Sequence, residues 1–308
     1  MVQHKTLIVR YIVLASVVVS AMLIVSLRMQ TVAAVEPTVG IQQEKITISP
    51  ASQTLSLDAG VSVTDNFKVI NNGDIAYDFV VYARPYSVSD EMYEPNFKDT
   101  KANADVYKWI QFEKTTYHAE PGQTIEVNYA MRVPSGAAPG GHYGVIFAET
   151  KEKTLDATGI SRQKRVGKLI YSTVNGNYRT TGEFAGFTLP FWQQQDSFTS
   201  SVRVKNTGNA DFDADVSTVA RDIFGTAKFT YTGKSKILPE TTRLINMKWD
   251  KAPAFGLFKV EQNSSFLGQK QTNSGYVLLV PQWLPVLLVL IVILGIGYAL
   301  VQKTRRRS

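Results

Sequence analysis

The stretch that decides the fold occurs twice in this chain of 308 residues. It reads FKVINNGDIAY from Phe67 to Tyr77 and VRVKNTGNADF from Val202 to Phe212, at a constant offset of 135 residues. Each copy begins with alternating apolar and polar side chains, passes through a turn that contains Asn and Gly, and reaches an aromatic residue. Alternation with a period of two is typical of a half-buried strand, and Asn and Gly favour tight turns. Each copy therefore predicts two strands joined by a short turn.

Further alternating runs follow each copy in the same order. The turn at Pro121-Gly122 precedes the run Ile125–Val133, and Pro239 precedes the run Leu244–Trp249. Because no amphipathic helix of ten residues interrupts these runs, the pattern predicts an all-β protein. The repeat predicts two tandem β-sandwiches, at residues 41–150 and 166–265. The polar segment 151–165 is interpreted as a linker between them.

Composition and charge exclude several classes of protein. With 44% hydrophobic and 19% charged residues, the chain is not largely disordered, and the lack of cysteine excludes disulfides and thiolate metal sites. The formal net charge is +7, yet every acidic residue lies between Glu36 and Glu261. The basic excess belongs to the two ends, so it indicates membrane topology, and no nucleic-acid partner is expected.

Residues 1–34 have the pattern of a signal peptide. Lys5 and Arg10 precede the apolar run Tyr11–Leu27, and Ala34 is a small residue at a plausible cleavage position. The apolar run is long for a signal peptide, so an uncleaved membrane anchor is the alternative.

The C-terminal end predicts one transmembrane helix. Residues 277–301 carry no charge, and Trp283 and Tyr298 lie near the ends of this run, where aromatic side chains favour the membrane interface. The basic tail, residues 302–308, is expected in the cytoplasm, and the region before the helix outside the cell. The chain is therefore expected to be a cell-membrane protein that crosses once, or twice if the N-terminal segment is uncleaved.

Three motifs of the first sandwich resemble a known family. They are Trp109-Ile110, Pro121-Gly122-Gln123-Thr124 and the run PGGHYGVIF at 139–147. This set resembles the bacterial WxL-interacting proteins. The resemblance implies a signal peptide, two immunoglobulin-like domains, one membrane helix and a basic tail. It also implies that the first domain binds peptidoglycan and that the second holds a WxL-type surface protein.

Residues with catalytic or metal-binding potential are sparse. The three histidines, His4, His118 and His142, lack the spacing of a metal site, and no nucleophile or phosphate-loop motif occurs. Asp211, Asp213 and Asp215 alternate, so they share one face of a strand, most simply the solvated face. We therefore expect no enzyme activity, no metal and no cofactor.

The segment Arg84–Lys108 is the longest excursion between predicted strands, and long loops of sandwiches often carry function. Its aromatic residues supply contact area at low entropic cost. The alternative is that these rings cap the core. The candidate ligand-binding residues are Tyr86, Tyr93, Phe97, Tyr107, His142 and Tyr143.

Two functions fit these features. The first is a non-catalytic, membrane-anchored cell-surface protein that binds cell-wall glycan or another surface protein. The alternative is an assembly chaperone or scaffold that adds a strand of its partner to one of its own sheets. The oligomeric state is left open.

Overall fold

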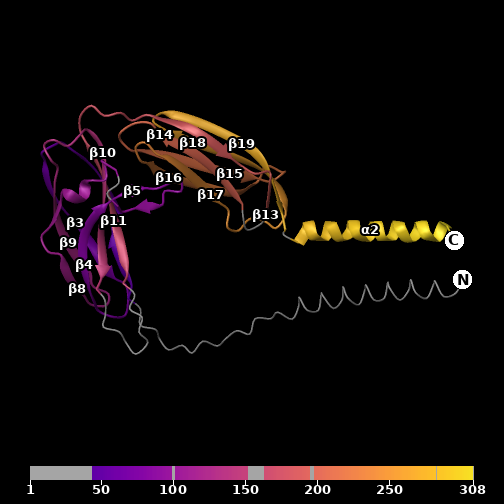
Figure 1. Cartoon of the computed structure of the whole chain (residues 1–308), viewed down its shortest axis with the longest axis horizontal. Coiled ribbons are helices and arrows are strands. Elements are labelled where there is room, and N and C mark those ends of the chain that lie inside the picture. Colours follow the sequence, from indigo (N-terminus) through magenta and orange to yellow (C-terminus); the bar gives the residue numbers. More distant parts are fainter. Residues whose placement is uncertain (1–43, 99–100, 152–162, 195–197, 282, 308) are drawn as a thin grey trace. The chain divides into compact units, whose positions relative to one another are not determined.

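The computed structural model describes residues 44–98, 101–151, 163–194, 198–281 and 283–307. They form two immunoglobulin-like β-sandwiches followed by one helix, which is the all-β fold that the sequence predicts (Figure 1). The expected signal peptide, residues 1–34, lies outside the described residues.

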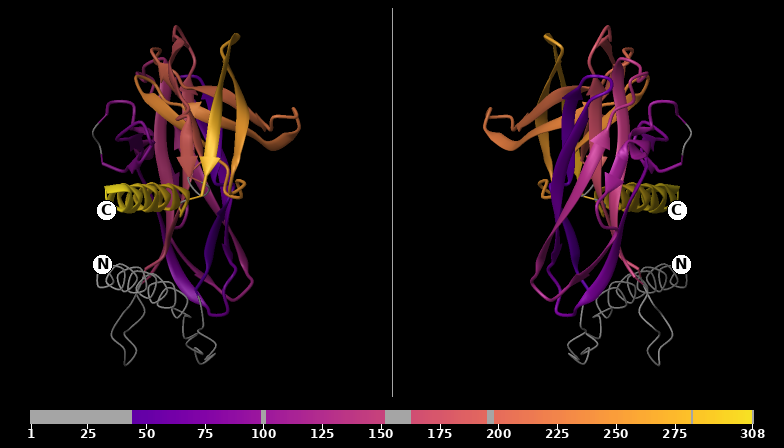
Figure 2. Two further views of the ribbon diagram at one scale, coloured as in Figure 1. Left: turned by 90° about the vertical axis from the view of Figure 1, so that its right-hand side faces the viewer. Right: turned by 90° about the vertical axis from the view of Figure 1, so that its left-hand side faces the viewer.

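The first sandwich packs a four-stranded sheet against a five-stranded sheet (Figure 2). Inward-facing side chains from both sheets form one core, which includes Phe67, Phe79, Met131 and Ile146. In spatial order the smaller sheet contains β1 (Ile46–Ser49), β3 (Ser62–Asn71), β9 (Thr124–Arg132) and β7 (Ile110–Phe112). The larger sheet contains β2 (Ser52–Leu57), β11 (Arg165–Val174), β10 (Gly140–Thr150), β4 (Tyr77–Pro85) and β8 (Thr116–Ala119).

The second sandwich repeats this plan with sheets of three and five strands. In both sandwiches the first strand is divided between the two sheets, because β2 runs parallel to β11 and β13 runs parallel to β19. The smaller sheet contains β12 (Gly182–Thr188), β14 (Thr199–Asn206) and β17 (Thr242–Lys248). The larger sheet contains β13 (Trp192–Gln194), β19 (Gln269–Val280), β18 (Gly256–Phe266), β15 (Phe212–Arg221) and β16 (Ala227–Ile237).

The boundary between the sandwiches differs from the prediction. Strand β11 pairs with both β10 and β2, so it belongs to the first sandwich. The segment 151–165 thus connects two neighbouring antiparallel strands and is not a linker between sandwiches. The strands of the second sandwich span 182–280, whereas the sequence predicted 166–265. The polar composition of the connection resembles that of a linker, which explains the error.

The C-terminal apolar run also divides differently. Val277 and Leu279 are fully buried in the core of the second sandwich, as part of β19. Pro281 follows this strand, and helix α2 (Trp283–Arg307) begins two residues later. The segment Trp283–Leu300 is, by length and composition, sufficient to cross a membrane, with a mean hydropathy of 2.6. The span predicted from the sequence, 277–301, thus includes the last residues of a core strand as well as this helix.

The sequence repeat corresponds to one buried asparagine in each sandwich. The side-chain amide of Asn71 donates to the carbonyls of Ile75 (2.9 Å) and Ala119 (3.1 Å), and its oxygen accepts from the Gly73 amide. Asn206 makes the equivalent set, with the carbonyls of Ala210 and Ile237 (both 2.9 Å) and the Gly208 amide (2.8 Å). Each asparagine thus ties the turn that crosses from one sheet to the other, between β3 and β4 or between β14 and β15, to another segment of the same sandwich.

We predict that Asn206→Ala destabilises the second sandwich by about 2 kcal/mol or more, because it leaves buried carbonyl and amide groups without partners. Chemical denaturation of residues 44–281 measures this loss. Asn72→Ala is the matched control, since the Asn72 side chain is exposed and donates to the Thr47 hydroxyl instead of to buried backbone groups. Equal losses in the two variants would contradict the assigned role of the buried asparagine.

Candidate functional site at the junction of the sandwiches

The excursion Arg84–Lys108 packs against the outer face of the larger sheet of the first sandwich. Tyr86 and Tyr143 are only 5% and 2% exposed, and they form one apolar cluster with Val145, Phe147 and Leu238. Phe97 is half-buried in this cluster and lies edge-on to Phe147, with ring centroids 4.9 Å apart. Strand β10 is therefore covered on both faces, because its inner face belongs to the core.

Tyr93 joins the excursion to the second sandwich through a closed ring of hydrogen bonds. The Leu238 amide donates to the Tyr93 hydroxyl (2.9 Å), which pairs with the Thr241 hydroxyl (2.5 Å). The Thr241 hydroxyl in turn donates to the Leu238 carbonyl (2.8 Å). The Arg243 guanidinium lies 4.3 Å from the centre of the Tyr93 ring. Every polar atom of this contact has a partner, as a buried junction requires.

Glu91 makes a second contact of the same kind. Its carbonyl accepts from the Leu244 amide (2.7 Å), and its carboxylate accepts from Arg203 Nε (2.8 Å). Leu244 belongs to β17, an edge strand of the smaller sheet of the second sandwich. The excursion thus covers part of this edge, where β5 (Ser87–Val88) and β6 (Pro95–Asn96) lie beside the second sandwich (Figure 1).

Asp211 is the charged centre of the junction. Its side chain is 4% exposed and accepts hydrogen bonds from the Tyr143 hydroxyl and the Lys236 ammonium, both at 2.8 Å. Burial disfavours the charge of Lys236, but its hydrogen bonds to Asp211 and Asp213 outweigh this effect and raise its pKa. Burial, together with Asp211, raises the pKa of Tyr143, so its hydroxyl remains a donor. The carboxylate thus holds one partner from each sandwich.

His142 is buried beside this junction, with both ring nitrogens occupied. Nδ1 pairs with Asp105 Oδ1 and Nε2 with the Ala138 carbonyl, each at 2.8 Å. Because both partners accept hydrogen bonds, they favour the doubly protonated ring. Burial opposes this charge, but the bonds to Asp105 and Ala138 prevail and raise the pKa of His142. His142 lines a groove of about 670 Å³, to which Asn209 and Glu240 of the second sandwich also contribute.

These positions bear on the six candidate ligand-binding residues. Tyr86, Tyr143 and His142 are buried, and Tyr93 contributes its hydroxyl to the junction, so the structure gives these four internal contacts. Phe97 and Tyr107 are half-buried. The sequence could not show this burial, because alternation along β10 does not reveal what covers its outer face. Ligand binding by any of the six stays a prediction.

Two further findings concern charge. Lys168 is fully buried above the rings of Phe67 and Tyr129. Burial lowers its pKa, although Asp65 favours the charge. Among the described residues, no group of three His, Asp or Glu side chains is arranged to hold a metal ion.

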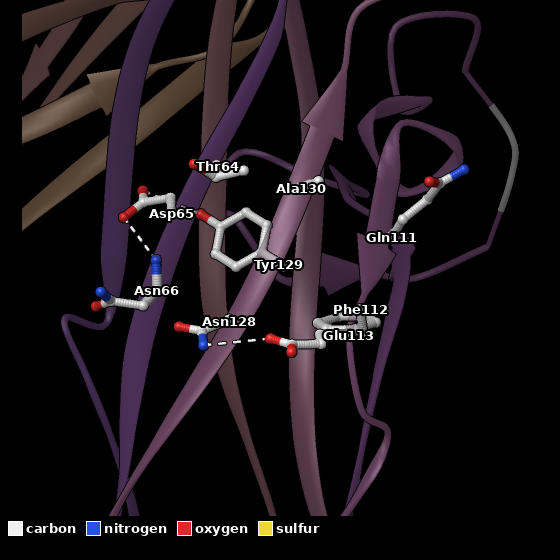
Figure 3. Close-up of a pocket in the computed structure, with 9 residues that line it drawn as sticks. All are labelled: Thr64, Asp65, Asn66, Gln111, Phe112, Glu113, Asn128, Tyr129 and Ala130. Carbon is white, nitrogen blue, oxygen red and sulfur yellow. Dashed lines mark hydrogen bonds between the residues drawn. The ribbon is translucent and has the colours of Figure 1, made fainter.

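A polar hollow of about 520 Å³ lies on the smaller sheet of the first sandwich (Figure 3). Exposed amide and carboxylate side chains line it, and Asn128 donates to Glu113 across it (3.4 Å). The other residues of the lining are Thr64, Asp65, Asn66, Gln111, Phe112, Tyr129 and Ala130.

Strand β16 is an edge strand that ends at the junction. It pairs with β15 on one side, and no other described strand pairs with it. On its other side the Lys236 carbonyl accepts from Arg243 Nη1 (2.8 Å). Polar backbone groups alternate between the two sides of an antiparallel strand. The amides and carbonyls of Thr230, Thr232 and Lys234 therefore point to the free side.

The lysines of β16 lie over the sheet. Lysines often block the edge of a sheet. Here Lys234 pairs with Asp215 (3.6 Å), and Lys236 with Asp213 (3.1 Å), both on β15. The alternating aspartates of β15 thus hold the lysines on the sheet face and leave the backbone edge open. Asp213 and Asp215 are exposed as predicted, whereas Asp211 is buried at the junction.

We predict that Asp211→Ala lowers the free energy of unfolding by about 3 kcal/mol, because it leaves the Lys236 charge without its buried partner. Asp215→Ala is the control, and its exposed pair with Lys234 predicts a loss within about 0.5 kcal/mol. Denaturation of residues 44–281 measures both, and similar losses would argue against a buried ion pair at Asp211.

A pH dependence follows from His142. Its folded pKa is raised above the unfolded value of about 6.5, so its contribution to stability is fully present below that pH. The contribution is lost as the pH rises through the folded pKa. The stability difference between the wild type and His142→Gln should therefore be larger at pH 6 than at pH 9. The exposed His118, whose pKa is also raised by its hydrogen bonds to Asp78 and Glu120, is the comparison, and His118→Gln should show a smaller change with pH because solvent screens its pairs. A difference for His142→Gln that grows with pH would contradict the assignment.

The comparisons with known proteins concern the fold alone. No protein-family model and no curated protein matches the chain. The class 5 fimbriae chaperone CfaA is 12% identical, with a TM-score of 0.38 over 77% of this chain and 100% of that one. The CsuC–CsuE chaperone–tip adhesion subunit complex of Acinetobacter baumannii matches at 9% identity, with a TM-score of 0.39 over 77% and 99% of the two chains. The Salmonella enterica SafA pilin–SafB chaperone complex matches at 8% identity, with a TM-score of 0.39 over 77% and 97%.

Proposed function

We propose that the chain is a non-catalytic, membrane-tethered scaffold or assembly chaperone for another cell-surface protein. The partner adds a strand to the free side of β16, between Ala227 and the junction at Ile237. Strand addition supplies main-chain hydrogen bonds for affinity, while alternate side chains provide specificity.

The observation that carries this proposal is the open edge of β16. It contains 11 residues, more than any other edge strand in the described parts of the two sandwiches. The edge strand β17 is partly covered by Glu91, and β12 carries a bulge between Phe184 and Gly186, which disturbs strand pairing. A strand with free backbone groups is a template for another chain.

The tether is part of the same proposal. Helix α2 anchors the chain, with its basic tail in the cytoplasm and both sandwiches outside the cell. The resemblance to WxL-interacting proteins implies the same arrangement and a surface-protein partner. The tether would keep the open edge at the cell surface, where such partners assemble.

Cell-wall glycan is the second candidate ligand. The polar hollow on the smaller sheet of the first sandwich supports it, because sugar hydroxyls pair well with amide and carboxylate groups such as those of Asn128 and Glu113 (Figure 3). Binding of purified wall polymer to this hollow, and its loss in Asn128→Ala, would favour the glycan.

We predict that Thr232→Pro abolishes capture of the partner from a cell-surface extract, because proline removes an amide from the free side of the edge. Thr232→Ala keeps that amide and should capture normally. Both variants should melt within a few degrees of the wild type, since this amide does not contribute to the pairing with β15. Equal capture by the two variants would exclude strand addition at this edge.

A further inference from the structure

Six large apolar side chains of the second sandwich are more than half exposed. Their exposed fractions run from 52% for Trp192 to 85% for Phe224, whereas no other large apolar residue described in this sandwich exceeds 41%. Scattered single residues of this kind are normal, but a group of them marks an interaction surface. The six are Phe191, Trp192, Ile223, Phe224, Phe255 and Tyr276.

Strand register places these six residues at one end of the sandwich. Arg221, just before the β15–β16 turn, pairs with Lys259, which pairs with Tyr276. Trp192 pairs with Leu278, and Gly256, next to Phe255, pairs with Leu279. All therefore lie where β19 ends at Val280, and the junction with the first sandwich lies at the opposite end of β15. We call these six residues the apolar end.

The most exposed part of the apolar end is the turn between β15 and β16, which is fixed by hydrogen bonds. The Asp222 carboxylate accepts from the amides of Phe224 and Thr226, both at 2.9 Å. Gly225 adopts a φ of +81°, which favours glycine. The turn thus holds Ile223 and Phe224 outward in a fixed conformation, at 71% and 85% exposure, instead of folding them over the sandwich.

The short connection between β19 and α2 indicates what lies next to the apolar end. Only two residues separate Val280 from the start of α2 at Trp283. The three Cα–Cα steps from Val280 to Trp283 span at most about 11 Å. If α2 crosses the membrane, the bilayer surface therefore begins within about that distance of the end of β19. An apolar partner protein would have to compete with lipid for the same space.

We propose that the apolar end inserts into the headgroup region of the bilayer from which α2 emerges. This inference rests on the membrane tether of the proposed function. Aromatic side chains favour the interface, where the ring is buried and polar atoms stay hydrated. The exposed cations Arg221, Lys251 and Lys259 lie on the same end, where lipid phosphates would pair with them. This second attachment holds the ectodomain at a fixed height, with β16 leading from the bilayer toward the junction.

The lack of cysteine makes a depth measurement direct. The full chain is reconstituted into vesicles of phosphatidylcholine and phosphatidylglycerol, with one environment-sensitive fluorophore on a single introduced cysteine. Phe224→Cys reports on the apolar end, and its exposure keeps the substitution out of the core. Leu290→Cys reports on α2, and Leu267→Cys reports on the hairpin at the opposite end of the sandwich. Lipids that carry a nitroxide at the headgroup or along the acyl chain quench labels that reach them.

We expect quenching by lipid nitroxide at positions 290 and 224, and at least several-fold less at 267. Quenching at 290 without quenching at 224 overturns the inference and leaves the tether intact. Absence of quenching at 290 overturns the tether, and the inference with it. A label at 224 that is shielded from aqueous iodide, but not quenched by the lipid, shows a protein neighbour and also overturns the inference.

Discussion

The arrangement of the two sandwiches depends on the hydrogen bonds of the Asp211 carboxylate. The carboxylate is almost fully buried, and it accepts from Tyr143 of the first sandwich and Lys236 of the second at 2.8 Å each. Asp211 and Lys236 both belong to the second sandwich and stay paired if the sandwiches separate, whereas the Tyr143 hydroxyl then loses its buried acceptor, which is costly. The ring of hydrogen bonds around Tyr93 and the backbone contact of Glu91 act in the same direction.

This junction also determines which surfaces remain for a partner. The aromatic excursion of the first sandwich is used to cover the outer face of β10 and part of the edge of β17. The excursion therefore connects the two sandwiches, and its aromatic rings pack within the protein. Lys236 lies near the end of β16 and pairs with Asp211, the residue that accepts from Tyr143, so the open edge ends beside the contact between the sandwiches. In the proposed function this geometry leads a bound strand toward the contact between the two domains.

Much of the fold could be predicted from local pattern, because a strand and its turn leave their signature in a few residues. The repeat identified one strand–turn–strand unit in each sandwich, and the two asparagines at its centre prove to be equivalent. The assignment of β11 failed because strand pairing depends on a distant neighbour, and the polar connection before it resembles a linker. The predicted bounds of the membrane helix, 277–301, were wrong because the strand before Pro281 and the helix after it are equally apolar. The burial of Asp211 and Tyr86 escaped prediction for a similar reason, since it comes from the excursion and from the other sandwich.

The central claim, that a surface protein is held along the free side of β16, is tested most directly by photo-crosslinking in intact cells that express the full chain. A photoreactive residue at position 232 faces the proposed partner, and one at position 272, on β19 of the same sheet, is the control. The account predicts a covalent adduct with another surface protein from position 232 and none from 272. An adduct from 272 alone, or none from either position, would contradict it.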